Sequence, residues 1–424
     1  MSVDAYRQKI LPVREQAAVR NRWLKQRLDD LLPELMAREG FDMWVIVCRE
    51  YNEDPVLMSL LPEPAMSARR RTILVFTRQD DGTVERLSLD RYGWGEYYQR
   101  GWEPEKEGQF ECLARVIRER DPEVIGINLS ETFAFGDGLS HSEYQFLAEA
   151  VGEELMGRTK SAERLCIGWL ERRIEPEMGV YPGLVEIGHA LIAEAYSSKV
   201  IQPGITTTDD VVWWMRQKMS DLGLKAWFQP SCEIQAQGLS FEGDYSERNP
   251  KRKLILPGDL LHCDVGFHYL GLATDQQQHA YILRPGETAA PAGLQAALAD
   301  GNRLQEIHME QMTLGWSGNE VLSAVREQAQ SEGIVPCVYS HPLGYHGHAA
   351  GPTIGLWDQQ GGVAGKGDYP LFDDTCYSIE LNVEKVVPEW DDQKVRIALE
   401  EDAVLSGGKM WWLNGRQTAL HLVG

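Results

Sequence analysis

The stretch LILPGDLLHCDVGFHYLGLATDQQQHAYIL, residues 254–283, decides the fold. It contains two apolar runs on either side of a turn signal at Tyr269-Leu270-Gly271, which predicts a β-hairpin. Asp264 and Asp275 are equally distant from the point between Tyr269 and Leu270, so strands paired about that point place the two aspartates opposite each other. Cβ atoms of cross-strand neighbours lie about 5 Å apart, and two ionised carboxylates that close require a shared proton or a cation.

A second predicted hairpin near the C-terminus repeats this arrangement. The segments CYSIELNVEKVV (376–387) and QKVRIALEEDAVL (393–405) have the composition of strands, and PEWDD (388–392) is the turn between them. Glu380 and Glu401 are centred on this turn. We therefore expect a second pair of carboxylates to face each other.

The choice between Glu400 and Glu401 depends on the two-residue period of a strand. Glu401 is in phase with the apolar residues Val395, Ile397 and Leu399, whereas Glu400 is on the other face. An apolar face points toward the core, so we predict that Glu401 is the inward carboxylate of this strand. A β-bulge would favour Glu400 instead.

The segment YSHPLGYHGHAAGPTIGLWD (339–358) is dense in histidine and glycine. Its three histidines, His341, His346 and His348, are more than a routine core segment carries. Carboxylates together with an imidazole suit Mn, Fe, Co or Zn. Four carboxylates balance the charge of two divalent cations, so the pattern predicts a two-metal centre.

Composition excludes several other classes of protein. The 424 residues exceed one ordinary core, and 43% hydrophobic with 25% charged residues is typical of globular chains. A formal net charge of -22 argues against nucleic-acid binding, which requires a basic surface. No apolar run approaches the roughly 20 residues of a membrane span, and the N-terminus carries no signal-peptide core. The sequence therefore predicts a cytoplasmic protein without nucleic-acid or membrane partners.

The first part of the chain alternates between helix and strand patterns, as α/β domains do. Residues 14–38 show apolar positions at helical spacing, and residues 110–120 form a second predicted helix. Buried strands are predicted at 42–48, 71–77 and 123–128. This part shows neither a phosphate-binding glycine loop nor a catalytic constellation, so we expect it to form one wall of a site or a subunit contact.

The pattern changes near residue 160, where amphipathic helices are followed by strand and turn segments. Further helices are predicted at 290–311 and 317–332. We therefore divide the chain into an α/β domain, residues 1–158, and a second domain, residues 159–424, that carries the carboxylates and histidines.

The order Asp, Asp, His, Glu, Glu and its surroundings resemble the pita-bread metallopeptidases, which include prolidase, aminopeptidase P and methionine aminopeptidase. GDLLHCDVG (258–266) is similar to the family's first aspartate strand, and Asp275 follows at the family's 11-residue interval. SHPLGYHGH (340–348) fits the family pattern H-x-x-G-x-x-x-H, and YSIEL and EEDAVL fit the two glutamate strands. The preceding domain is similar to the N-terminal domain of creatinase and prolidase. The expected fold class is α+β, a pita-bread domain preceded by an α/β domain.

The resemblance implies roles for individual residues. Glu380 moves a proton as well as binding metal, His348 donates a hydrogen bond to the reacting carbonyl, and Arg396 contacts the substrate. Relatives are often dimers, so a homodimer acting on a small peptide or small molecule is expected. Two divalent ions are implied, with manganese the first choice and cobalt, zinc or iron as alternatives. The implied metal ligands are Asp264, Asp275, His341, Glu380 and Glu401, of which Asp275 and Glu401 bridge the two ions.

One alternative alignment of the glycine-rich segment stays open. His348 also fits a G-H-x-x-G pattern, which would put Gly355 where the family's second histidine belongs. The alignment on His341 accounts for both histidines and is preferred.

The chain departs from the family around the substrate. The family carries a histidine before the first aspartate, whereas residues 232–253 contain none, and QQQH (276–279) replaces a Thr-Arg-Thr-like run. Three functions therefore remain: an Xaa-Pro aminopeptidase or dipeptidase, an enzyme with the same metals acting on a small non-peptide amide or zwitterion, and a non-catalytic binding module. Relatives of the second kind act on creatine, ectoine or a sulfonium acid, and relatives of the third kind bind histones or ribosomes.

Five aromatic residues have two interpretations. They form either a box for a cationic substrate or, as aromatic residues usually do, part of the core. The five are Trp227, Phe228, Trp390, Trp411 and Trp412.

Overall fold

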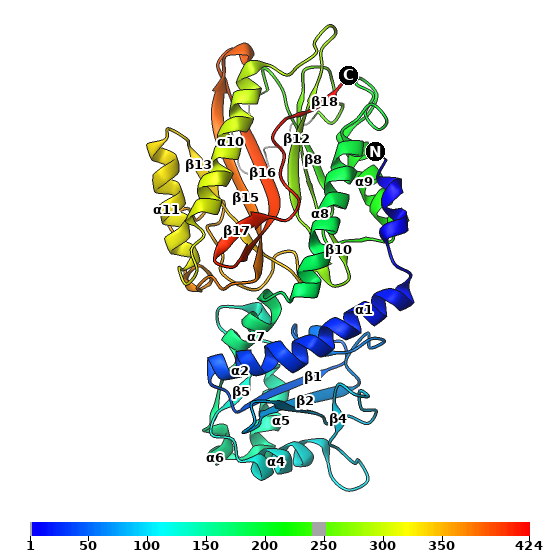
Figure 1. Cartoon of the computed structure of the whole chain (residues 1–424), viewed down its shortest axis with the longest axis vertical. Helices are drawn as coiled ribbons and strands as arrows, with labels where there is room; N and C mark the ends of the chain where they lie inside the picture. The colour runs from blue at the N-terminus through cyan, green and yellow to red at the C-terminus, as the bar shows by residue number, and fades with distance from the viewer. Residues whose placement is uncertain (1, 240–251) are drawn as a thin grey trace. The chain divides into compact units, whose positions relative to one another are not determined.

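The structure, a computed structural model, describes residues 2–239 and 252–424. Contacts within the chain divide it into two compact units, which Figure 1 shows from blue to red along the sequence. The first unit is Pro12–Ile174, and the second combines Met1–Leu11 with Glu175–Gly424. None of the helices in the described part of the chain has the length and apolar character of a membrane span.

The first unit is a mixed six-stranded sheet with helices on both of its faces (Figure 1). The strands, in the order β4-β3-β2-β1-β5-β6, are β1 (Met43–Arg49), β2 (Arg71–Arg78), β3 (Val84–Ser88), β4 (Gln99–Arg100), β5 (Ile125–Ile127) and β6 (Thr159–Ser161). The helices are α1 (Val13–Gln26), the π-helical η2 (Arg27–Leu31), α2 (Leu32–Glu39), α3 (Leu57–Leu60), α4 (Gln109–Arg120), η3 (Ala134–Gly136), α5 (His141–Val151), α6 (Glu153–Met156) and α7 (Glu163–Glu171). These elements confirm the predicted α/β pattern.

Both faces of this sheet are buried. Val45 and Val75 face the core that α4 and α5 complete, while Trp44 and Phe76 stack on the other face with ring centroids 5.3 Å apart. A strand covered on both faces shows a continuous apolar run in place of alternation, which is why the predicted strands of this unit lie within a few residues of the observed ones.

The division between the units falls after Ile174 and differs from the predicted division after residue 158. The reason is that β6 pairs in parallel with β5, so residues directly after 158 complete the first sheet, and α7 then packs against α2. The first eleven residues belong to the second unit, where the Tyr6 hydroxyl donates to Glu186 at 2.9 Å.

The second unit contains a nine-stranded sheet whose main path is β13-β15-β16-β12-β9-β8. The strands of this unit are β7 (Lys225–Ala226), β8 (Ser231–Gln235), β9 (Leu260–Val265), β10 (Phe267–Tyr269), β11 (Leu272–Ala273), β12 (Gln276–Ile282), β13 (Pro336–Val338), β14 (His341–Leu343), β15 (Thr375–Val387), β16 (Gln393–Ser406), β17 (Lys409–Trp412) and β18 (His421–Val423). Its helices are η1 (Val3–Lys9), α8 (Glu175–Ala195), α9 (Thr208–Leu222), α10 (Ala292–Gln311), α11 (Gly318–Ser331), η4 (Lys366–Asp368) and η5 (Pro388–Trp390).

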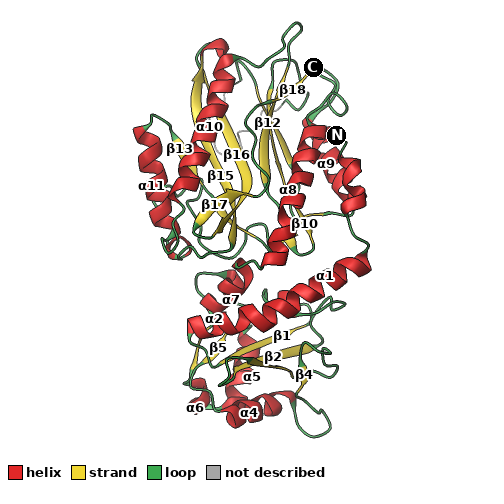
Figure 2. Cartoon of the chain, in the orientation of Figure 1, coloured by secondary structure: helices red, strands yellow, loops and turns green. Residues whose placement is uncertain are grey.

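Helices cover one face of this large sheet, with α10 over β15 and β16 and α11 beside α10 and against β13 (Figure 2). Ile379 and Leu381 of β15, and Ile397 and Leu399 of β16, are fully buried in the core that these helices complete. Side chains alternate between the faces of a strand, so the residues between these four point to the face that the helices leave uncovered.

The first hairpin has a different register from the predicted one. Its turn is at Leu270-Gly271, both with positive φ (55° and 80°), and Asp264 therefore pairs with Gln277. The prediction that Asp264 directly opposes Asp275 is wrong by two residues along one strand. A shift of two keeps both aspartates on one face, where they are diagonal neighbours.

The second hairpin differs by one residue, with larger consequences. A five-residue loop closes on the pair Val387 and Gln393, so Glu380 pairs with Glu400 and Ile379 pairs with Glu401. A one-residue shift exchanges the two faces of a strand. The prediction that Glu401 opposes Glu380 is wrong because the loop sets a register one residue away from the predicted one. The apolar phase of Glu401 does not correct this error, because both faces of β16 are buried and the apolar face is not the one that carries the site.

Gly188 allows α8 to pack closely against the sheet. A Cβ on Gly188 would collide with the side-chain amide of Gln276, coming within 2.7 Å of its Cδ. Gln276 is fully buried and its Nε2 donates to the Val185 carbonyl at 3.3 Å, so it has no room to move. We expect Gly188→Ala to lower the free energy of unfolding by about 1–3 kcal/mol, measured by denaturant unfolding.

The matched control lies in the same helix. A Cβ added at Gly179 would have no atom within 4 Å, so Gly179→Ala should leave stability unchanged or raise it by up to about 1 kcal/mol. Equal effects of the two substitutions would contradict the close packing at Gly188.

Candidate metal centre

One row of polar residues crosses four strands of the large sheet. Asp264 on β9 pairs with Gln277 on β12, Gln277 pairs with Glu400 on β16, and Glu400 pairs with Glu380 on β15. Directly opposite residues of paired strands share a face. All four side chains therefore lie on the face opposite to the one that α10 covers.

A second row lies two residues further along the strands. The backbone N–H of Asp275 donates to the Asp402 carboxylate at 3.2 Å, Asp402 pairs with Ser378, and Ser378 pairs with His341 on β14. The Ser378 hydroxyl donates to Glu400, which joins the two rows into one site.

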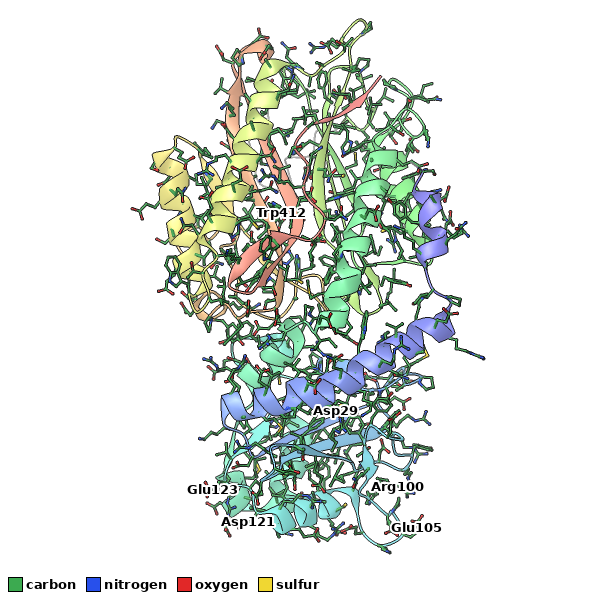
Figure 3. All side chains as sticks on the ribbon, in the orientation of Figure 1. Asp29, Arg100, Glu105, Asp121, Glu123 and Trp412 are labelled. Atoms are coloured by element: carbon green, nitrogen blue, oxygen red, sulfur yellow. The ribbon has the colours of Figure 1, made fainter. Side chains whose placement is uncertain are left out.

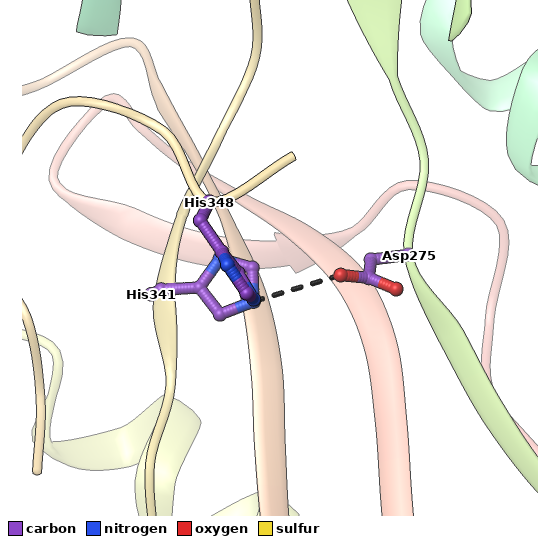
Figure 4. Close-up of side chains that lie close together, drawn as sticks. All are labelled: Asp275, His341 and His348. Carbon is purple, nitrogen blue, oxygen red and sulfur yellow. Dashed lines mark ion pairs between the residues drawn. The ribbon is translucent and has the colours of Figure 1, made fainter. Parts of the chain in front are cut away.

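The candidate ligand atoms converge closely. His341 Nε2 lies 3.4 Å from Glu400 Oε1, 3.6 Å from Asp275 Oδ2 and 3.9 Å from Glu380 Oε2. Figure 4 shows His341 and His348 directed toward Asp275. Three overlapping groups, each with its ligand atoms within 4.8 Å of one another, together comprise Asp264, Asp275, His341, His348, Glu380 and Glu400.

Glu401 does not take part in this cluster. Among the described residues it belongs to none of the three groups, and on the helix-covered face its Oε2 lies 2.6 Å from His189 Nε2. Its Oε1 accepts from Gln278 Nε2 at 2.8 Å and from the backbone N–H of Gln417 at 2.9 Å. Glu400, which belongs to two groups, therefore occupies the position that the sequence predicts for Glu401.

The electrostatics of the cluster call for protons or for a cation. Burial and then the charge of Glu400 raise the pKa of Asp264, Asp275 and Glu380 well above the usual range of carboxyl groups. Two like charges 4 Å apart repel by about 4 kcal/mol at an effective dielectric of about 20, whereas a hydrogen bond contributes a net stabilisation of only about 1 kcal/mol. Hydrogen bonds alone therefore do not offset the repulsion.

The residues present fit a divalent metal. Asp264 Oδ1, Asp275 Oδ1 and His341 Nε2 are buried and make no hydrogen bond within the described part of the chain. Orphaned buried acceptors are rare in folded proteins and indicate an ion or a water. Carboxylate oxygens with one imidazole nitrogen are the donor set of Mn, Fe, Co and Zn sites.

Two residues that hold the cluster in place are absent from the sequence-based prediction. Gln277 Nε2 donates to Glu380 Oε1 at 2.5 Å and to Glu400 Oε2 at 2.8 Å. His262 Nε2 lies 2.9 Å from Gln277 Oε1, which fixes the orientation of the amide. The signal is present in the sequence, since His262 precedes Asp264 by two residues on a strand and therefore shares its face.

His348 lies at the open side of the cluster. It is exposed, in contrast to His341, and the two ring centroids are 4.7 Å apart. Desolvation by the surrounding residues and the neighbouring His341 lower the pKa of His348 to about 4. Gly355 is packed against the Val338 carbonyl with φ 75°, so the geometry favours the alignment in which His341 and His348 are the two histidines of the motif.

The five aromatic residues do not form one box. Trp227 contacts Phe228 and His348, with centroids 4.4 Å and 5.2 Å apart, so this pair borders the site. Trp390 is buried in the helix-covered core, Trp411 is 57% exposed, and Trp412 on β17 packs against the same core (Figure 3).

Arg396 lies on the same face of β16 as Glu400. It is buried, and its Nη2 lies 3.7 Å from Glu233 Oε2, so the predicted substrate contact of Arg396 stays a prediction. The stretch 232–253, which lacks the family's histidine, lies partly outside the described residues, since these exclude 240–251.

A buried cluster of carboxylates and imidazole on a pita-bread sheet defines a class of metal-dependent hydrolases. The model of metallopeptidase family M24 matches residues 184–406, just over half of the chain. The chain belongs to this family and is a hydrolase. The candidate ligands Asp264, Asp275, His341 and Glu380 favour an enzyme over the non-catalytic binding module.

Solved structures share the fold across both units. An X-Pro aminopeptidase from Thermotoga maritima has a TM-score of 0.64 at 16% identity, with 92% of this chain and 100% of that chain covered. The dipeptidase PepE from Mycobacterium ulcerans has a TM-score of 0.63 at 17% identity, with 96% and 98% covered. A prolidase from Pyrococcus furiosus has a TM-score of 0.58 at 14% identity, with 91% and 99% covered. Among curated proteins, no match is found.

Adjacent glutamates provide a matched pair for testing the metal site. We expect Glu400→Gln to weaken metal binding by at least about 100-fold, because Glu400 belongs to two of the ligand groups. Glu401→Gln, one residue away on the other face, should keep metal binding within about tenfold of the unaltered protein. Calorimetric titration with Mn²⁺ measures both, and a larger loss in Glu401→Gln would restore Glu401 as the ligand.

Proposed function

We propose that the chain is a two-metal exopeptidase that cleaves an N-terminal peptide bond, with Xaa-Pro dipeptides or short Xaa-Pro peptides as substrates. The observation that carries the proposal is the row Asp264, Gln277, Glu400 and Glu380 with His341 beside it. The Xaa-Pro specificity is supported by solved structures of the same fold that are described as X-Pro aminopeptidase and prolidase.

The residues that would hold two ions follow from the overlapping groups. Asp264, Asp275 and Glu400 would hold one ion, and His341, Glu380 and Glu400 would hold another. Two divalent ions polarise a carbonyl group and lower the pKa of water to near neutrality.

The chain's own residues position the substrate and move protons. Glu380 lies at the end of the row, where its carboxylate accepts a proton from the attacking water and passes it to the leaving amine. His348, with its lowered pKa, is neutral near pH 7 and donates one N–H to the carbonyl oxygen of the scissile bond. Gln277 keeps Glu380 and Glu400 in place through its two hydrogen bonds.

A second substrate class is proposed on separate observations. Trp227 and Phe228 form an aromatic wall beside His348, and aromatic faces attract cationic groups. The family's upstream histidine is absent from residues 232–253. These features favour a small zwitterion or non-peptide amide over a peptide.

Three further properties are part of this proposal. Manganese is the metal to test first, since oxygen ligands dominate the site. A homodimer is proposed from the resemblance to prolidase and creatinase. A cytoplasmic location is proposed from the seven cysteines, which are scattered and free, as is typical of proteins kept under reducing conditions.

A substrate panel distinguishes the two classes. We expect the purified protein with added Mn²⁺ to release the N-terminal amino acid from Xaa-Pro dipeptides and tripeptides, measured by amine detection, and to lose this activity with a chelator. His348→Ala should lower kcat by about 100-fold, and it should weaken manganese binding less than Glu400→Gln does, because His348 belongs to one candidate ligand group and Glu400 to two.

The panel also includes creatine, ectoine and a sulfonium carboxylate. Turnover of one of these without turnover of any Xaa-Pro peptide would replace the peptidase with the second class. Manganese binding without turnover of either set would refute both substrate classes while leaving the metal centre intact.

A further inference from the structure

An arginine-rich cavity lies within the first unit, apart from every residue of the metal centre. The cavity has a volume of about 520 Å³, within the range of small-molecule sites. Its lining comprises Arg49, Glu50, Arg69, Arg70, Arg71, Asp90, Arg91, Tyr92, Trp102 and Gln109. Five arginines in one cavity stand out in a chain whose net charge is -22.

The cavity lies beyond the carboxyl ends of three strands of the first sheet. Arg49 ends β1, and β3 and β4 end shortly before Asp90 and Trp102. β1 and β3 are both antiparallel to β2, and β4 is parallel to β3, so the three strands end at the same edge. In open α/β sheets, ligands bind beyond the carboxyl ends of the strands.

Buried carboxylates fix the base of the cavity without neutralising it. Glu143, only 1% exposed, binds Arg71 Nε at 2.6 Å and Arg49 Nε at 3.1 Å. Asp90 accepts from the backbone N–H of Tyr92 at 2.9 Å and from the indole of Trp94 at 2.6 Å. Glu50 is the third carboxylate of the cavity, so five guanidinium groups face three carboxylates and the cavity is positive.

Three of the arginines remain available to a ligand. Arg69, Arg70 and Arg91 make no ion pair within the described residues, and all three are exposed. Arg69 lies over the Tyr92 ring at 4.7 Å, and Arg91 over the Trp102 ring at 5.6 Å, which restricts these guanidinium groups before a ligand arrives. Arg70 has φ 47°, a left-handed conformation that is unfavourable for a residue with a side chain and is found often at ligand sites.

We propose that this cavity binds a small anion that carries carboxylate or phosphate groups. All of its cations are arginine, whose planar guanidinium matches the two oxygens of either group through paired hydrogen bonds. Arg70 and Arg91 contact the anion directly, and Arg49 and Arg71, held by Glu143, form the fixed wall behind it. The proposal is independent of peptidase activity.

Calorimetric titration of the full chain with inorganic phosphate and, separately, with succinate tests the proposal. We expect at least one of the two anions to bind, more weakly at higher salt. The double substitution Arg70→Gln and Arg91→Gln should lower the affinity by about tenfold or more. Arg22→Gln on α1, an exposed arginine outside the cavity lining, is the matched control and should leave it unchanged.

Each outcome decides the question. Preference for phosphate or for succinate, lost in the double variant, supports the cavity and identifies the acid group. Absence of binding by both anions at millimolar concentration overturns the proposal. Binding that the double variant retains also overturns it, because the anion is then held elsewhere, as at a metal ion.

Discussion

The structure of the second unit depends on one constraint, the mutual repulsion of carboxylates that the sheet register places side by side. Asp264, Glu400 and Glu380 lie in one row across adjacent strands, with Asp275 diagonal to Asp264. Burial prevents water from screening these charges, so the row is compatible with folding only where protons or cations balance it. Gln277, Ser378 and His341 donate hydrogen bonds or lie close by, yet they supply too little positive charge. Protons or bound cations are therefore a condition for burying this row of carboxylates, and a divalent metal would meet that condition while also serving catalysis.

Much of this site follows from the sequence. Spacing and the resemblance to a family predict the two hairpins, the convergence of Asp264, Asp275, His341 and Glu380, and the position of His348 beside them. The spacing of the aspartates predicts their shared face correctly because the side chains of a strand alternate with a period of two. An error of two residues in the first hairpin therefore leaves both aspartates on the same face.

The errors also have physical causes. Glu401 is in phase with Val395, Ile397 and Leu399, but both faces of β16 are buried, and an apolar face then marks the helix side of the sheet and not the site. The length and conformation of the loop after Val387 decide the register, and the loop sequence alone does not specify them. The predicted domain boundary falls before β6 because three residues of edge strand carry almost no pattern.

The contact between His189 and Glu401 has a consequence for the neighbouring glutamate. Glu401 is held by His189 of α8, by Gln278 and by the backbone of Gln417 near the C-terminus. Since Glu400 and Glu401 are consecutive on one strand, fixing the second carboxylate on the rear of the sheet also fixes the backbone from which the first projects. The contacts of Glu401 on the helix side of the sheet therefore restrain the position of Glu400 on the opposite side. The geometry of the candidate metal site therefore depends partly on α8 and on the last residues of the chain, which supply none of its ligand groups.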